Sequence, residues 1–153
     1  MLFIGHIREN ALKRSEIRLE LRAKVEPVLE HLIKIFYHRE DEGTTYFWEK
    51  EAWRYLHKVA LKKNNKTPDY ALIIDGIWYS RLEDFDDDHK DFIDDINEEY
   101  EDKLPRIRKL DSRVRDFCFR YFDWLAKELA KSRRLERDVV VEEIESLLKD
   151  YPL

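Results

Sequence analysis

The sequence contains few of the residues that form tight turns. It has only three glycines and four prolines among 153 residues. A β-rich protein with many hairpins needs more of both residue types. Leucine, glutamate, lysine and arginine, which favour helices, are abundant instead. The composition therefore predicts an all-α protein.

Cysteine is almost absent as well. Cys118 is the single cysteine, so no disulfide can form within the chain, and nothing in the composition indicates secretion. The apolar start of the sequence is interrupted by His6 and Arg8 before it reaches the length of a signal-peptide core. The longest uninterrupted apolar run, 70–74, is far too short to cross a membrane. We therefore expect a cytoplasmic protein that does not bind membranes.

The apolar content is sufficient for a hydrophobic core. Apolar residues make up 43% of the chain and aromatic residues 13%, beside 41% charged residues. This balance argues against a disordered chain. The length is typical of one domain, and no repeat, linker or low-complexity segment marks a boundary. We expect 1–153 to form a single helical domain, a bundle of about six helices with short connections.

Apolar residues recur at spacings of three and four along most of the chain, which places them on one face of each predicted helix. In the longest predicted helix, this face runs from Ile107 and Leu110 to Leu129. Asp138 is expected to cap the last helix. The predicted helices span 7–36 with a kink or restart at Pro27, 46–62, 70–85, 87–104, 106–131, and a final stretch after Asp138.

The segment 71–79 is compatible with two structures. Asp75 and Gly76 lie between two apolar runs, which is typical of a hairpin. The apolar residues of 70–85 also fit one face of a helix, and burial can offset the cost of about 1 kcal/mol for a glycine inside it. The helix is the preferred interpretation. Because this segment is the most apolar, we expect it to be the central helix.

Charge is distributed unevenly along the chain. The segment from Glu83 to Asp102 contains twelve acidic residues and one base, Lys90, so it carries a net charge of −11 in a chain of net charge −5. A basic segment that includes Lys103, Arg106 and Lys109 follows directly. An acidic helix is thus expected to precede a basic one.

This asymmetry has three interpretations. The two helices can pack antiparallel and compensate each other's charges, which is the preferred one. Alternatively, the acidic face is a docking surface for a basic partner, with Asp86, Asp87, Asp88, Asp91, Asp94 and Asp95 as candidate binding residues. In the third, a stripe of Arg106, Lys109, Arg113 and Arg120 holds phosphates. Direct nucleic-acid binding is not expected, because the nearby aromatic residues lie on the apolar face.

The predicted helix 46–62 has aromatic residues on more than one side. Trp48 and Trp53 are its tryptophans. They can contact the core on two faces. They can also form an exposed patch of the composition that protein-binding hot spots and homodimer interfaces favour. Both tryptophans are therefore candidate partner-binding residues.

Motifs for catalysis are weak. Acids at 84, 86 and 88 resemble the start of a calcium loop, but His89 replaces the required glycine. The five histidines lack the spacing of a zinc site, and no glycine-rich phosphate loop is present. Cys118 lies between two phenylalanines, as expected of a buried structural thiol. We expect no metal ion and no cofactor.

Three functions remain open. The first is a non-enzymatic helical protein that binds itself, as a homodimer, or another protein. The second is an acidic inhibitor or nucleic-acid mimic that docks on a basic partner through 83–102. The third, which the residues favour least, is a metal-dependent enzyme whose carboxylates are brought together by folding.

Overall fold

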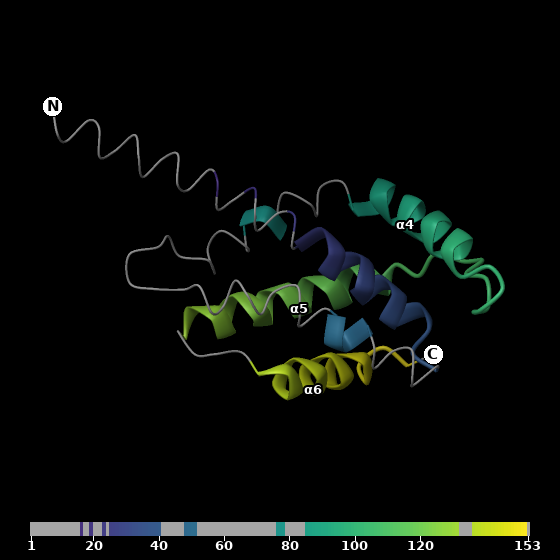
Figure 1. Ribbon diagram of the computed structural model, residues 1–153. Helices are drawn as coiled ribbons and strands as arrows, with labels where there is room; N and C mark the ends of the chain where they lie inside the picture. The colour runs from purple at the N-terminus through teal and green to yellow at the C-terminus, as the bar shows by residue number, and fades with distance from the viewer. Residues whose placement is uncertain are drawn as a thin grey trace, which may run out of the picture.

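The computed structural model describes residues 16, 19, 23, 25–40, 48–51, 76–78, 85–131 and 136–152, with the side chain of Asp86 left out. Its labelled helices are α4 (Phe85–Glu99), α5 (Arg113–Ala130) and α6 (Arg137–Leu148) (Figure 1). The segments 25–37, 48–51 and 76–78 are helical as well, and these described parts contain no strand. The predicted all-α class is therefore confirmed. Within the same parts, no helix is long and apolar enough to cross a membrane.

The helical segment 25–37 packs against both α4 and α5. Its apolar side chains are at most 1% exposed: Val25, Val28, Leu29, Leu32, Ile33, Ile35 and Phe36. Phe36 packs against Phe117 of α5, with ring centroids 5.6 Å apart. Tyr37 contacts His89 of α4 at 5.8 Å. Figure 1 shows this segment, in purple, running between α4 and α5.

The expected central helix, 70–85, lies largely outside the described residues. Its described part, 76–78, is helical, which agrees with the preferred interpretation and not with a hairpin turn at Gly76. Trp78 is 1% exposed and stacks on Phe122 of α5 at 4.5 Å. Among the described elements, however, segment 25–37 occupies the central position.

The predicted inner face of the long helix is correct from residue 114 onward. Within α5 the buried side chains repeat at spacings of three and four: Val114, Phe117, Cys118, Tyr121, Phe122, Leu125 and Leu129. α6 packs against α5 and buries Val140, Ile144 and Leu147. Asp138 does not cap α6 as predicted. It lies in the first turn, because the N-cap position is Glu136.

The boundaries around residue 105 differ from the prediction. α4 ends at Glu99 and α5 begins only at Arg113, so 100–112 is a turn followed by irregular chain. The Asn97 side chain binds the backbone of Ile107 twice: Nδ2 donates to the carbonyl at 2.9 Å, and Oδ1 accepts from the N–H at 2.8 Å. These bonds occupy the backbone N–H and carbonyl of Ile107, which a helix would need for its own hydrogen bonds. Leu110 is consequently 47% exposed and not on an inner face.

Candidate protein-interaction surface

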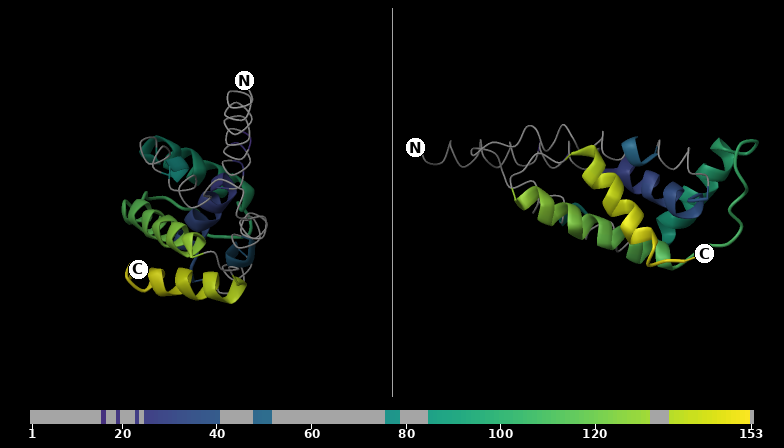
Figure 2. Two further views of the ribbon diagram at one scale, coloured as in Figure 1. Left: turned by 90° about the vertical axis from the view of Figure 1, so that its left-hand side faces the viewer. Right: turned by 90° about the horizontal axis from the view of Figure 1, so that it is seen from below.

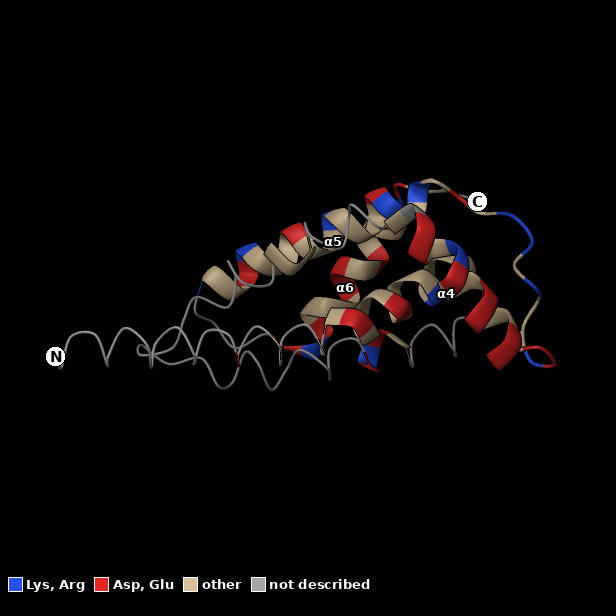
Figure 3. Ribbon diagram, turned by 90° about the horizontal axis from the view of Figure 1, so that it is seen from above, with Lys and Arg blue, Asp and Glu red and all other residues tan. Residues whose placement is uncertain are grey.

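One side of α4 carries a row of acidic side chains. Their spacing of three or four residues places them on the side of the helix that faces away from its buried residues, Phe85, Ile93 and Ile96. We call this row the acidic ridge, and it consists of the exposed residues Asp87, Asp91, Asp94, Asp95 and Glu98. Acidic residues follow each other along the outer side of α4 in Figure 3. At 1.5 Å per residue, the ridge is about 17 Å long.

The ridge contains most of the acids that the sequence nominated. Asp87, Asp91, Asp94 and Asp95 are exposed as expected, whereas Asp88 is partly buried and lies outside the ridge. The side chain of Asp86 lies outside the described residues. Glu98 was not nominated, although its spacing of four from Asp94 could have identified it.

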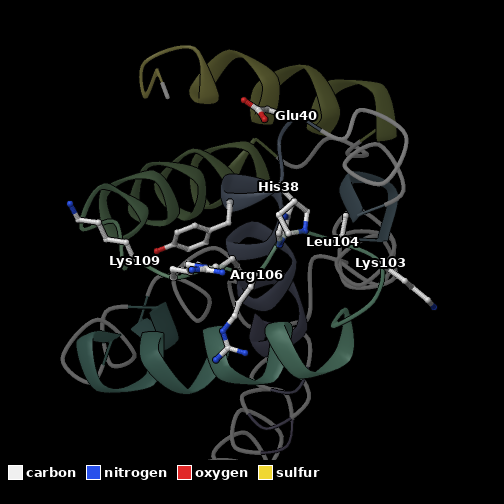
Figure 4. Close-up of a pocket in the computed structure, with 10 residues that line it drawn as sticks. His38, Glu40, Lys103, Leu104, Arg106 and Lys109 are labelled. Carbon is white, nitrogen blue, oxygen red and sulfur yellow. The ribbon is translucent and has the colours of Figure 1, made fainter.

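A row of basic side chains follows α4 in the irregular segment. We call it the basic loop, and it consists of the exposed residues Lys103, Arg106, Arg108 and Lys109. These residues line a concavity of about 790 Å³ whose wall also includes Tyr37 and His38. In Figure 4, Lys103 and Lys109 point away from each other at opposite ends of this concavity. The shape suits an extended, multiply charged partner better than a single small anion.

Hydrogen bonds fix the basic loop relative to α4. The backbone N–H of Asp111 donates to the Tyr37 hydroxyl at 2.8 Å, and that hydroxyl lies 2.8 Å from Nε2 of His89. The hydroxyl oxygen accepts from Asp111 and shares a second hydrogen bond with the His89 imidazole, whose direction depends on the His89 tautomer. Burial raises the pKa of Tyr37 to about 12, so the hydroxyl keeps its proton at neutral pH. Tyr37 thereby ties the end of the loop to α4.

The beginning of α5 is set by Asp111. Its Oδ1 accepts the backbone N–H of Arg113 at 3.0 Å, and its carboxylate also binds the Arg113 guanidinium. The hydrogen bond from Arg113 holds the pKa of Asp111 below its usual value. The carboxylate satisfies an N–H group of the first helical turn, which explains why the helix starts here and not at 106.

The charges of the acidic and basic segments do not compensate each other by direct ion pairs. Within the part of the chain that the structure describes, no residue of the ridge or of the basic loop forms one. Lys34, which is 4% exposed, instead binds Glu30 at 3.2 Å and Glu99 at 3.3 Å. The direct ion pairs that the preferred interpretation implies are therefore absent for the described residues of the ridge and the loop.

The predicted phosphate-binding stripe is divided between two structures. Arg106 and Lys109 belong to the loop, whereas Arg113 and Arg120 hold the C-terminal segment. Arg113 donates to the carbonyl of Pro152 at 2.7 Å, and Arg120 binds Asp150 at 2.7 Å. The four residues thus do not form one helical face.

Tyr151 makes several of the contacts that attach the C-terminal segment to the rest of the protein. It is 6% exposed, and its ring lies 6.0 Å from the rings of Phe36 and Phe117. Its hydroxyl donates to Asp116 and accepts from Arg120 at 3.2 Å. Arg39 donates to the backbone carbonyls of Leu148, at 3.1 Å, and of Tyr151. Three arginines thus hold this segment and are committed to internal contacts.

Trp48 is not a surface residue. It is 1% exposed and packs edge-on against Tyr100 at 5.6 Å, with His38 at 6.1 Å. The Lys34 ammonium lies 5.9 Å from the centre of its ring. Its nomination as a partner-binding residue is therefore wrong, because the ring fills the core. Trp53 lies outside the described residues.

The sequence finds no match among known protein families, curated proteins or solved structures.

The described residues include no cluster of three or more histidine, cysteine, aspartate or glutamate side chains that could hold a metal ion. Cys118 is 0% exposed, and burial raises the pKa of its thiol far above the usual value. A thiol in this environment is packed in the core as a small apolar group, as the sequence predicted.

Proposed function

We propose that this protein is a non-enzymatic interaction protein that binds itself or another protein through the end formed by α4 and the basic loop. One observation carries the proposal. Nine exposed charged side chains at this end make no ion pair in the described part of the chain, whereas Lys34, Arg39, Arg113 and Arg120 are all engaged in internal contacts.

The acidic ridge does not help α4 to fold. Three pairs of its acids, 87/91, 91/95 and 94/98, are four residues apart, and each such pair of like charges destabilises a helix by about 0.2–0.5 kcal/mol. Acids near a helix C-terminus also oppose the helix dipole, and the last turn of α4 has no basic residue. The like-charge pairs together cost on the order of 1 kcal/mol, which is partly offset by Asp87 in the first turn and by Lys90 four residues before Asp94. A basic partner would relieve the remaining repulsion on binding.

Affinity capture with a matched control tests this proposal. The tagged protein is compared with a ridge variant that neutralises three acids: Asp91→Asn, Asp94→Asn and Glu98→Gln. The control neutralises three exposed acids of α6: Asp138→Asn, Glu142→Gln and Glu145→Gln. Each bait is exposed to a lysate of the source organism, and captured proteins are quantified by mass spectrometry.

We expect at least one protein to be captured by the wild type and the α6 control but depleted at least about tenfold with the ridge variant, since several charge contacts are lost. High salt should weaken the same capture. If every captured protein is retained equally by all three baits, the ridge is only a solvated helix face and the proposal is refuted.

The spacing of the ridge supports a second candidate, a nucleic-acid mimic. Five carboxylates over about 17 Å correspond to one charge per about 4 Å, close to the 3.4 Å per charge along one DNA strand. In that case the captured partner would bind DNA or RNA, and the wild-type protein would compete with the nucleic acid. A partner whose nucleic-acid binding is unchanged by excess protein would exclude mimicry while leaving the interaction function intact.

A further inference from the structure

The acidic ridge and the basic loop lie side by side at one end of the molecule. Figures 1, 2 and 3 agree that the chain leaves the end of α4, turns, and runs back beside it toward α5. The ridge contributes five negative charges and the loop four positive charges. One end of the protein therefore presents two adjacent surfaces of opposite sign, with the exposed acids Glu101 and Asp102 between them in the chain.

These surfaces are adjacent within one chain, but they form no direct ion pair in the part of it that the structure describes. The ridge points away from the core, on the side of α4 opposite Ile93 and Ile96. The loop is fixed in its middle by the two bonds between Asn97 and Ile107, and at its end by the bond between Asp111 and Tyr37. Asp94 of the ridge nevertheless lines one concavity together with Arg106 and Arg108 of the loop, so the two surfaces meet along α4. A second molecule that presents both signs of charge would contact the two surfaces together.

We infer that this second molecule is another copy of the same chain, which binds by its acidic ridge to the basic loop and receives the same contact in return. A two-fold symmetric interface requires each surface to meet its complement on the partner, and this is possible only when both lie on the same side of the protomer. The ridge and the loop meet that requirement. This inference rests on the proposed interaction function and identifies its partner.

The same end also provides an apolar contact. Leu110, directly after the loop, is 47% exposed and lines two concavities, one of them shared with Asp94 and Arg108. Protein interfaces usually combine apolar side chains at the centre with charged side chains around them. Leu110 beside the four cations fits this pattern, and in a dimer it would be covered by the α4 region of the partner.

Reversing the charge of the ridge in one variant and of the loop in another tests whether the two surfaces bind each other. One variant has a basic ridge, with Asp91→Lys, Asp94→Lys and Glu98→Lys. The other has an acidic loop, with Arg106→Glu, Arg108→Glu and Lys109→Glu. Mass is measured by light scattering after size-exclusion chromatography over a dilution series, at about 0.1 M and about 1 M salt, between which the Debye length falls from about 10 Å to about 3 Å.

The wild type should be a dimer that dissociates on dilution and at high salt. In either variant alone, both surfaces of the end have the same sign, so self-association should weaken by at least about tenfold. An equimolar mixture of the two variants should again form a dimer, because each ridge then meets a loop of opposite charge. Circular dichroism tests whether both variants retain their helices. The milder ridge variant used for affinity capture, with Asp91→Asn, Asp94→Asn and Glu98→Gln, should also dimerise less than the wild type.

Two results would overturn the inference. The first is a wild type that remains monomeric at the lower salt concentration and the highest protein concentration. The second is a mixture of the two variants that fails to form a heterodimer. Neither result affects the affinity capture, in which a ridge-dependent foreign protein would still support the interaction function, so the two proposals can fail separately.

Discussion

Glu49 is expected to make the protein less stable above neutral pH than in mild acid. The residue is 2% exposed, and its Oε2 atom is buried without a hydrogen-bond partner. Burial, with a smaller contribution from the negative charge of Glu145, raises the pKa of Glu49 from 4.5 to about 7. A buried carboxylate is costly, because it loses its hydration without gaining compensating bonds.

The sign and size of the effect follow from the two pKa values. Since the pKa is higher in the folded state, the folded protein binds this proton more tightly than the unfolded chain does. The penalty is absent below about pH 4.5, grows as the pH rises, and is complete above about pH 7. A difference of about 2.5 pKa units corresponds to about 3 kcal/mol in the free energy of unfolding.

Substitution Glu49→Gln isolates this effect, because the amide stays neutral. Urea unfolding of wild type and variant is compared at about pH 5 and about pH 8.5. We expect similar stability at the lower pH, and a variant that is more stable by about 3 kcal/mol at the higher pH. His31, whose pKa burial lowers, titrates equally in both proteins and cancels in the comparison. The control Glu145→Gln should give a much smaller gain. Parallel pH profiles for wild type and Glu49→Gln would refute the reasoning.

Three further predictions concern single residues. Tyr151→Ala should lower the free energy of unfolding by about 3–5 kcal/mol, measured in urea, whereas Tyr151→Phe should cost only about 1 kcal/mol; equal losses would contradict the packing role of the ring. Gly76→Ala should raise the free energy of unfolding by about 0.5–1 kcal/mol, because the position is helical and exposed and a Cβ there would meet no atom within 4 Å. Cys118 should react with a thiol reagent only after unfolding; rapid reaction of the native protein would show that the thiol is accessible.

The helical faces were predictable because they depend on local spacing. In 28–36 and 114–129 the apolar residues repeat every three or four positions, and the structure buries them. The segment 100–112 was not predictable in the same way. Its conformation depends on the bonds from Asn97 to Ile107 and from Tyr37 to Asp111, the second of which spans 74 residues. A polar contact between distant residues leaves no periodic pattern in the sequence.

The candidate site was predictable to a similar degree. Acids on one helix face are exposed whenever the opposite face is apolar, so the ridge followed from spacing alone. Trp48 shows the opposite case. The sequence alone does not distinguish a tryptophan buried in a core from one exposed in a binding hot spot. The contacts of Trp48 with Tyr100 and Lys34 are what place it in the core.

The arginines show why a charge count does not locate a binding surface. In the sequence, Arg106, Arg113 and Arg120 look equivalent, since each lies in the same basic stretch. In the structure, Arg113 and Arg120 bind the C-terminal segment, and a foreign anion could recruit them only by displacing Pro152 or Asp150. Arg106 has no such contact, so it can bind a partner without any loss inside the protein. The basic charge available for binding is therefore the part that the fold leaves unpaired, and in the described residues this part consists of the basic loop together with Lys90 and Lys149.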